Sequence, residues 1–343
     1  QPWQLAVLDE AQAIKNPASQ TAKASRLVVA RHRLALTGTP VENHLGELGS
    51  FFEFINPGLL GRLPRLEILT AGRAPSKREL EQLAEDLRPF IFRRTKAQVL
   101  PDLPTKTEQV LFCDMRQEQR ELYDRMRARY QVSLLEQVET QGVSGSTIQV
   151  LEALLRLRQV ACHPGLVEAS WEGAGSAKLE TLFDHVAEVL DEGHKVLVFS
   201  QFTTLLRYVR RHLDEQGLPY AYLDGKTKDR AEVVERFQSD PACKVFLLSL
   251  KAGGVGLNLT AAGYVFLLDP WWNPAVEAQA IDRSHRIGQT QPVFAYRMIA
   301  RGTVEEKLLE LQQAKRDLAD AILDGEGQSL RDLTADDLRT LLS

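Results

Sequence analysis

Short apolar runs that end in polar or turn-forming residues occur at both ends of this chain, separated by helical stretches. Near the start, the run at 5–8 (LAVL) is followed by two acids at 9–10, and the run at 34–36 (LAL) by 37–40 (TGTP). Such short runs are typical of buried parallel strands, whose carboxyl ends carry the chemistry of α/β sheets. Residues 19–30 between them have a helical pattern. The beginning of the chain therefore predicts a strand, a helix and a second strand, which is too little for a stable sheet alone.

From residue 62 to about residue 175 the pattern changes, and long stretches with helical spacing dominate. Residues 116–138 and 149–160 are predicted helices. Residues 88–96 (RPFIFRRTK) hold four cations and no acid, which is the densest local positive charge of the chain. We expect this middle part of the chain to be mainly helical.

From about residue 177 the alternation of strands and helices returns. Strands are predicted at 196–199, 245–248, 265–268 and 294–299. Helices are predicted at 203–215 and 229–238. This alternation indicates a parallel sheet covered by helices on both faces, which makes one complete α/β domain.

The tail of the chain predicts one more helix at 303–323, with apolar residues at 304, 308, 311, 318 and 322. Thr303 and Glu306 fit a capping box at its start, and Gly325 fits its end. We expect this helix to lie across another element.

Composition narrows the classes of protein that fit. The 343 residues carry 42 Lys and Arg against 46 Asp and Glu, a net charge of −4, which excludes a generally basic nucleic-acid coat but allows a local basic groove. Three widely spaced cysteines exclude a disulfide framework and a four-cysteine zinc site. No apolar run approaches the ~20 residues of a membrane span, and no signal peptide begins the chain. We therefore expect a soluble, reduced, intracellular protein, and, because the chain opens inside an apparent strand without Met, a piece of a longer polypeptide.

Asp9 and Glu10 form the first candidate site, because they follow a predicted central strand. Asp9 can bind a phosphate-bound Mg²⁺, directly or through water, while Glu10 polarises an attacking water. Residues 37–39 (TGT) follow the next strand and can hydrogen-bond a carboxylate of the neighbouring strand. Solvated acids and a well-capped turn explain the same residues, so neither segment alone decides between the alternatives.

Gln279, Arg283 and Arg286 form the second candidate site. Asn273 and Pro274 fit the cap and first position of a helix, so the spacing i, i+4, i+7 predicts that the three side chains share one face. Guanidinium groups suit phosphate oxygens and can stabilise phosphoryl transfer. An arginine face paired with nearby acids is the alternative.

Residues 250–258 (LKAGGVGLN) follow the predicted strand at 245–248 and contain three glycines, which permit close approach of a nucleotide or a phosphodiester chain. A tight turn is the alternative. Cys162 and His163 lack a partner pair at zinc-ligand spacing. Trp271 and Trp272 suit either stacking on a base or packing in a core.

Seven segments in this order resemble the SWI/SNF-related helicase-like ATPases of superfamily 2, and Gln12 places the resemblance nearest the bacterial and archaeal branch. The segments are DEAQAIKN (9–16), LALTGTPVENHLGEL (34–48), RRTKAQVLPDLPTK (93–106), KVLVFSQF (195–202), LDG (223–225), SLKAGGVGLNLTAA (249–262) and DPWWNPAVEAQAIDRSHRIGQ (269–289). Together they span nearly the whole chain.

The resemblance implies an α/β fold with two RecA-like parallel sheets, one partial and one complete, and ATP in the cleft between them. Residues 1–61 would be the remnant of the first lobe, 62–175 a mainly helical linker and protrusion, 176–300 the second lobe, and 301–343 a C-terminal brace helix and tail. Closure of the lobes would bring the arginines to the transition state.

Residue roles follow from the same resemblance. Catalytic or metal-linked positions are Asp9 for Mg²⁺, Glu10 for water activation, and Gln279, Arg283 and Arg286 across the cleft. Thr37, Gly38 and Thr39 match the motif that couples nucleotide state to lobe movement. Segments near the nucleic-acid backbone include Ser200, Gln201 and Lys251, and the glycine-rich block borders the nucleotide with Gly254, Gly256 and Asn258.

One family motif is absent, because no G-x-x-x-x-G-K-[ST] loop occurs among the 343 residues. In the family that loop precedes the DEAQ strand, so we expect this chain not to hydrolyse ATP unaided. The expected function is that of a double-stranded DNA translocase that uses ATP and Mg²⁺, displaces a DNA-bound protein complex and binds no membrane. It would act in the cytoplasm, on the nucleoid, if the source is prokaryotic. The alternatives are a non-catalytic nucleotide- or DNA-binding scaffold and an RNA helicase.

Overall fold

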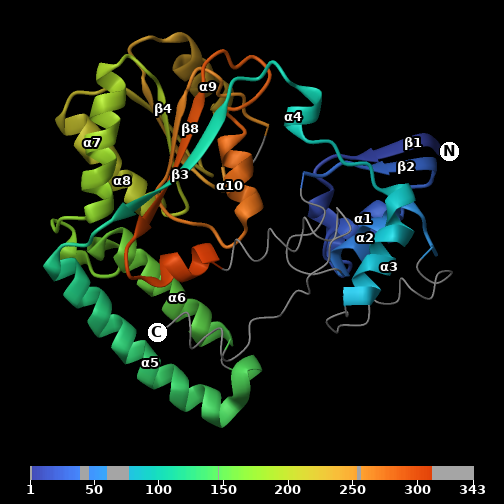
Figure 1. Ribbon diagram of the computed structural model, residues 1–343, viewed down its shortest axis with the longest axis horizontal. Coiled ribbons are helices and arrows are strands. Elements are labelled where there is room, and N and C mark those ends of the chain that lie inside the picture. The colour runs from blue at the N-terminus through green and yellow to red at the C-terminus, as the bar shows by residue number, and fades with distance from the viewer. Residues whose placement is uncertain (1, 39–45, 60–76, 146, 253–255, 311–343) are drawn as a thin grey trace. The chain divides into compact units, whose positions relative to one another are not determined.

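The computed structural model describes residues 2–38, 46–59, 77–145, 147–252 and 256–310. The chain divides into two compact units, and the division falls between Arg94 and Thr95 (Figure 1).

The first unit contains two parallel strands with helices packed on one face. Strand β1 (Trp3–Leu8) pairs with β2 (Ala30–Ala35), and Leu8 lies opposite Ala35 at the carboxyl ends. The helical elements are η1 (Ala11–Ile14), α1 (Gln20–Arg26), α2 (Gly46–Ile55), α3 (Lys77–Leu87) and η3 (Arg88–Phe90). The predicted strand, helix and strand are thus present, although α1 ends at Arg26 and β2 already begins at Ala30.

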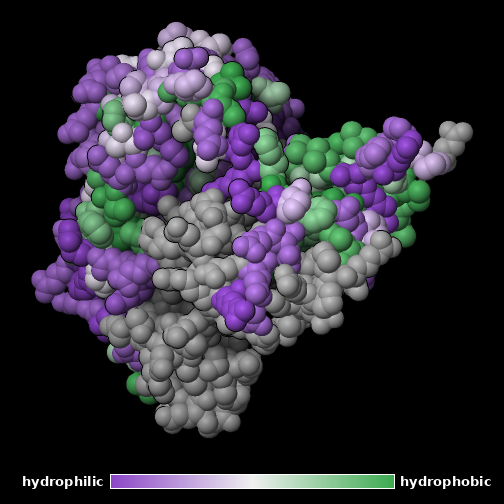
Figure 2. Space-filling view, turned by 45° about the vertical axis from the view of Figure 1, so that its right-hand side comes forward, coloured by the Kyte–Doolittle hydropathy of each residue, from purple (hydrophilic) through white to green (hydrophobic). Residues whose placement is uncertain are grey.

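The two faces of this small sheet differ in burial. Ala6 and Leu8 pack on the helical core, which includes Phe51 and Phe52 of α2. The other face is apolar and exposed among the residues that the structure describes, as the hydrophobic surface of this unit in Figure 2 shows. Its members are Trp3, Leu5, Val7, Leu34 and Leu36, each 46% to 68% exposed. The strands were predicted to be buried on both faces, and the described part of the chain covers only one.

The second unit contains a six-stranded parallel sheet in the order β3-β8-β7-β4-β6-β5. Its strands are β3 (Lys106–Cys113), β4 (Val196–Ser200), β5 (Tyr220–Leu223), β6 (Val245–Ser249), β7 (Tyr264–Leu267) and β8 (Val293–Ala300). Its helices are α4 (Lys96–Val99), α5 (Gln117–Gly145), α6 (Thr147–Cys162), α7 (Ala177–Asp191), α8 (Thr203–Glu215), α9 (Arg230–Ser239) and α10 (Pro274–Ile281), with short turns η4 (Pro164–Leu166) and η5 (Ala169–Trp171).

Both faces of this sheet are covered, as the alternation of elements predicts (Figure 1). Val196 and Val198 of β4 pack with α7 and α8 in one apolar cluster. Leu197 and Phe199 pack in the other cluster, to which α9 and α10 contribute. The period of two along a strand places alternate residues on opposite faces, so a fully buried strand must be apolar throughout.

Residues 62–175 are mainly helical where the structure describes them, as expected, but they also contain an edge strand that was not predicted, β3. It pairs with β8 over its whole length, from Lys106 opposite Val293 to Cys113 opposite Ala300. The segment KTEQVLFC carries acid and amide residues, so it lacks the continuous apolar run of the central strands. An edge strand has a partner on one side only and tolerates such polar positions.

The predicted tail helix begins where expected. Residues 304–310 are helical, and the predicted remainder to 323 lies outside the described residues. The Thr303 hydroxyl accepts a hydrogen bond from the Glu305 amide at 3.2 Å, and the Glu306 carboxylate accepts one from the Gly302 amide at 2.9 Å. Both predicted residues cap the start of the helix, but each accepts from the amide one position before the amide that a capping box uses. Within the described ranges, no helix combines the length and apolarity that crossing a membrane requires.

Candidate functional site

The acids of the first unit lie at the carboxyl end of β1, beside the residues that follow β2. The Thr37 hydroxyl donates to Gln12 Oε1 at 2.9 Å, and Gln12 Nε2 donates to Glu10 Oε2 at 2.5 Å. The two segments are also joined by the backbone, because the Ala11 amide donates to the Leu36 carbonyl at 2.9 Å. A chain of hydrogen bonds therefore connects the predicted coupling residue Thr37 to the predicted catalytic Glu10 through Gln12.

Glu10 has an unusual backbone conformation. Its φ of 48° and ψ of 52° lie in the left-handed region. Among the residues that the structure describes, no other residue apart from glycines has a positive φ. This conformation costs an ordinary side chain about 1 kcal/mol or more and is concentrated at functional sites. It turns the chain sharply at the strand end, so that Asp9 and Glu10 stay exposed while Ala11 is buried.

Gln12 is the residue that sequence reasoning missed here. In the sequence it marks only the family branch, yet its side-chain amide bridges the two motifs. Gly38 follows Thr37 in the described chain, whereas Thr39 lies outside the described residues.

In the second unit, β4 and β7 end at a buried carboxylate. Asp269 accepts from the Ser200 hydroxyl at 2.5 Å and from the Gln201 amide at 3.2 Å. Ser200 is fully buried, and its hydroxyl is used in the hydrogen bond to Asp269. Its side chain is therefore not exposed to a nucleic-acid backbone in this structure. Gln201 is partly exposed, and its Nε2 has no hydrogen-bond partner among the described residues.

Buried ion pairs stabilise the chain at Leu268 and Asp269, just after β7. Arg158 of α6 lies 3.9 Å from Asp269 and donates to the Pro270 carbonyl. Lys178 of α7 donates to the Leu268 carbonyl at 2.7 Å and pairs with Glu305 at 2.7 Å, with both side chains fully buried. Burial alone would lower the pKa of Lys178, but the neighbouring Cys162 and Glu305 raise it, so the lysine stays charged. Asp269 was missed as a site residue, although an acid directly after a strand is the same signal that identified Asp9.

The arginines of the second candidate site do not share a helix face with Gln279, which corrects the sequence-based prediction. Helix α10 begins at Pro274 under the Asn273 cap, as expected, but it ends at Ile281. Gln279 is therefore on the helix, whereas Arg283 and Arg286 lie in the turns that follow. Arg283 is buried, at 8% exposure, and Arg286 is exposed.

Tertiary hydrogen bonds explain why α10 stops. The Leu259 amide donates to the Arg283 carbonyl at 2.9 Å, and the Ser284 hydroxyl donates to the Ala262 carbonyl. Gln289 Nε2 also donates to the Ala262 carbonyl, at 3.0 Å. A continuing helix would use the Arg283 carbonyl itself, whereas here the Leu259 amide takes it up. With the side-chain bonds of Ser284 and Gln289 to Ala262, this contact holds residues 282–289, called the arginine turn below.

Helix α10 is fixed to the sheet by Glu277, whose side chain is fully buried. Its carboxylate accepts from the Trp271 amide at 2.7 Å and from Arg297 Nε at 2.8 Å. Arg297 also pairs with Glu108 of β3 at 2.6 Å. Although burial raises the pKa of Glu108, hydrogen bonds from Lys106 and Arg297 outweigh it and lower the pKa to about 2.

The glycine-rich block is described in part. Lys251, Gly256 and Asn258 are exposed, and Gly256 has a φ of 49° that a residue with a side chain adopts rarely. Gly254 lies outside the described residues. The tryptophans pack inside the unit, since Trp271 borders one core cluster and Trp272 another, where Arg158 lies 5.6 Å from its ring.

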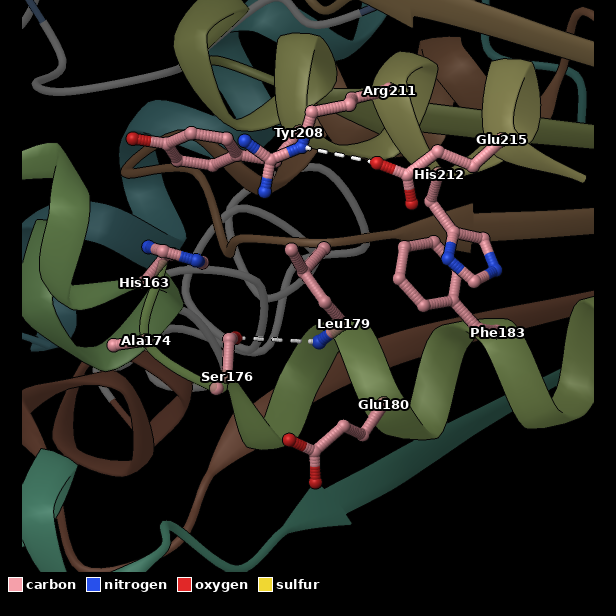
Figure 3. Close-up of a pocket in the computed structure, with 11 residues that line it drawn as sticks. His163, Ala174, Ser176, Leu179, Glu180, Phe183, Tyr208, Arg211, His212 and Glu215 are labelled. Carbon is pink, nitrogen blue, oxygen red and sulfur yellow. Dashed lines mark hydrogen bonds and ion pairs between the residues drawn. The ribbon is translucent and has the colours of Figure 1, made fainter. Parts of the chain in front are cut away.

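A separate pocket of about 180 Å³ lies between α7, α8 and the chain after α6 (Figure 3). His163 stacks on Tyr208 at 4.3 Å and Phe183 on His212 at 3.7 Å. None of the sequence-predicted site residues lines it. The pocket is therefore distinct from the candidate site.

A metal would find few protein ligands. The described residues contain no group of three or more His, Cys, Asp or Glu able to hold an ion. Asp9 is exposed at a strand end, which suits Mg²⁺, because that ion is commonly held by one or two carboxylates together with substrate phosphates and waters.

The geometry assembles the predicted residues in two groups. Asp9, Glu10 and Thr37 meet in the first unit. In the second unit, Ser200 and Gln201 meet Asp269 at the carboxyl ends of the strands, whereas the arginine turn meets residues 259–262 beside the amino ends of β7 and β8. The acids and arginines belong to different units, so their approach to a common triphosphate stays a prediction.

Parallel sheets with motif-bearing loops at their carboxyl edges define an α/β protein of the RecA-like class. The SNF2-related domain matches residues 1–166 of this chain, and the helicase conserved C-terminal domain matches residues 177–288. The ATPase core of Sulfolobus solfataricus SWI2/SNF2, solved in complex with dsDNA, is 34% identical with a TM-score of 0.53, over 95% of this chain and 70% of that one. The chain belongs to the SWI2/SNF2-related family of helicase-like ATPases.

Two bacterial relatives are similar over almost the entire chain. A Mycoplasma pneumoniae protein described as an uncharacterized ATP-dependent helicase is 36% identical over 99% of this chain and 32% of its own length. The Bacillus subtilis putative ATP-dependent helicase/translocase YwqA is 35% identical over 99% of this chain and 38% of its own length. The chain thus spans about a third of the length of these relatives.

Proposed function

We propose that this chain supplies the water-activating acid, the coupling motif and the arginines of a DNA-dependent ATPase that moves along double-stranded DNA and displaces bound proteins. The observation that carries the proposal is the hydrogen-bonded chain from Thr37 through Gln12 to Glu10 at the end of β1. It links the proposed catalytic carboxylate to a neighbouring motif, as coupling of nucleotide state to movement requires.

In the proposed reaction, Glu10 orients the water that attacks the γ-phosphate of ATP and takes its proton. Asp9 would hold Mg²⁺, which would supply positive charge to neutralise the phosphates. Arg283 and Arg286 supply positive charge to the transition state when the two units close on the nucleotide. Gln279 would help to orient the phosphate groups from the end of α10.

Double-stranded DNA is the proposed track, because the related ATPase core from Sulfolobus solfataricus was solved with dsDNA. Lys251 and Gln201 lie in loops that follow β6 and β4, and both strands end at the same edge of the sheet. Contacts of this kind go to phosphates, so binding would have little sequence preference and a marked salt dependence. The net charge of −4 allows this, since only the groove must be basic.

The absence of a phosphate-cradling loop makes a first test possible. The 343 residues alone should show no ATP hydrolysis above background with duplex DNA. A fusion that joins a family segment carrying G-x-x-x-x-G-K-T ahead of residue 1 should hydrolyse ATP, with stimulation by duplex DNA. If the fusion binds ATP and DNA but never hydrolyses ATP, the scaffold alternative is correct.

Substitution in the fusion tests the assigned roles. Glu10→Gln should lower the DNA-stimulated rate at least about 100-fold while ATP binding is retained. Glu188→Gln, a change at a side chain that is 76% exposed on α7, is the matched control and should leave the rate unchanged. Undiminished turnover in Glu10→Gln would refute the assignment, and stimulation by RNA in place of duplex DNA would favour an RNA helicase.

A further inference from the structure

Lys96 contacts the arginine turn at groups other than those that residues 259–262 bond. Its Nζ pairs with Asp282 Oδ1 at 2.8 Å and donates to the His285 carbonyl at 2.9 Å. These two partners stand on either side of Arg283 in the sequence, and His285 directly precedes Arg286. One ammonium group therefore ties together the beginning and the middle of the turn that carries both arginines.

A second contact comes from the same segment. Nε2 of His285 lies 2.8 Å from the Pro104 carbonyl, and the ring is 8% exposed. A carbonyl only accepts hydrogen bonds, so this nitrogen carries a proton and donates. The next residue, Thr105, accepts at its carbonyl from the Val293 amide at 2.9 Å, at the start of the pairing of β3 with β8. The segment 96–105 is thus fastened at one end to the turn and at the other to the sheet.

Local structure fixes where Lys96 stands. Thr95 and Gln98 form a capping box, in which the Thr95 amide donates to Gln98 Oε1 at 3.1 Å, and Lys96 is the first residue of α4. The division between the two units falls between Arg94 and Thr95. Lys96 is therefore the first residue of the first helix in the second unit, two residues after the last residue of the first unit, Arg94.

We propose that Lys96 is a positioning residue for Arg283 and Arg286, which orders the arginine turn and links it to the connection between the units. The proposal rests on the proposed function for the role of the arginines, but its structural part does not. Lysine suits this position because a compact ammonium can bond a carboxylate and a carbonyl at once. Asp282 and Lys96 are both partly exposed, at 37% and 39%, so the contact is accessible to substitution without emptying the core.

Hydrogen exchange of the 343-residue chain tests the structural part. Lys96→Ala should speed exchange of the amides at 282–289 about tenfold, because it removes both contacts, and should leave exchange in β6 unchanged. Lys244→Ala is the matched control, since Lys244 also donates to a carbonyl, that of Leu190 at 3.1 Å, and precedes β6, which β7 and β4 separate from β8. Exchange at 282–289 that does not respond to Lys96→Ala would overturn the proposal.

Kinetics of the fusion protein test the functional part. Lys96→Ala should lower kcat about tenfold with little change in the KM for ATP, and Lys96→Arg should restore part of the loss. In a background of Arg283→Ala combined with Arg286→Ala, Lys96→Ala should cause no further loss, because the residue acts through these two arginines. Additive losses, or an equal effect on KM, would show that Lys96 has only a general structural role. If the unsubstituted fusion hydrolyses no ATP, the proposed function fails, while the exchange experiment still decides whether Lys96 orders the turn.

Discussion

His163 shows how single residues of the second unit are held in one protonation state. Its ring is 3% exposed, stacks on Tyr208, and accepts a hydrogen bond from the Gly165 amide at Nδ1, at 2.9 Å. Burial, with the nearby positive charge of Arg211, lowers the pKa of His163 from 6.5 to about 4. The neutral ring caps the turn η4 and closes one wall of the pocket in Figure 3.

This pKa predicts an acid-sensitive fold. The folded state binds the proton more weakly than the unfolded state does, so the stabilisation is complete above pH 6.5 and is lost as the pH falls from 6.5 to about 4. We expect the free energy of unfolding of the second unit to fall by about 3 kcal/mol over this range from His163 alone. Urea denaturation at a series of pH values measures it.

His163→Asn provides the comparison, because asparagine keeps an acceptor for the Gly165 amide but does not titrate. Its stability should be lower at neutral pH, through loss of the stacked ring, and should depend less on pH between 6.5 and 4. His194→Asn changes a histidine that is 35% exposed and should keep the original pH dependence. Identical pH profiles for all three proteins would contradict the prediction.

At the scale of the element, α10 depends on contacts made far along the chain. Its eight residues are too few for a stable isolated helix. The helix is held by the Asn273 cap, by the apolar contacts of Ala280 and Ile281, and by the bonds from Glu277 to Trp271 and Arg297. The position of the arginine turn follows from this anchorage.

Glu277→Gln should therefore be strongly destabilising. It removes the charge that a buried Arg297 faces, and breaking one partner of a buried pair costs about 3 kcal/mol or more. Thermal or urea unfolding of the 343-residue chain measures the loss. Glu192→Gln, at a glutamate that is 66% exposed, should change stability by less than about 0.5 kcal/mol. A loss no larger than that of the control would show that Glu108 alone satisfies Arg297.

At the scale of the whole molecule, the exposed face of β1 and β2 is the feature that departs most from an ordinary protein surface. Large apolar side chains stand together there, from Trp3 at 68% exposure to Leu36 at 46%. Contiguous apolar patches of this kind bind partners or cause association. The 343-residue chain should therefore self-associate and bind an apolar dye such as ANS.

Leu5→Lys combined with Leu34→Lys should reduce both effects, because the two residues project from the same face. Dye fluorescence should fall several-fold, and sedimentation velocity should show a larger fraction of monomer. Leu218→Lys, at an apolar residue that is 37% exposed in the second unit, should leave both measurements unchanged. If the double substitution has no effect on either, another surface is responsible for the association.

The sequence by itself determined the order of most elements and which residues stand at strand ends, because both are written in local patterns. The apolar run of β4 and the stripe of α8 (Thr203–Glu215, as predicted) require no knowledge of the neighbours. The acids after β1 and the arginines after α10 were identified from the sequence because the residues of each motif lie close together along the chain. The family resemblance, once those residues were read together, gave the fold class as well.

Only the tertiary structure decided which polar groups each of these residues meets. The strand β3 joins the sheet because it pairs with β8 at the edge of the sheet. Its own sequence of mixed polar and apolar residues does not predict this pairing. The turn after α10 is held by residues 259–262, which bond the Arg283 carbonyl and the Ser284 hydroxyl, and Ser200 is turned inward because its hydroxyl donates to Asp269. Such contacts join residues tens of positions apart, and their free energy depends on burial and direction, which a one-dimensional pattern does not contain.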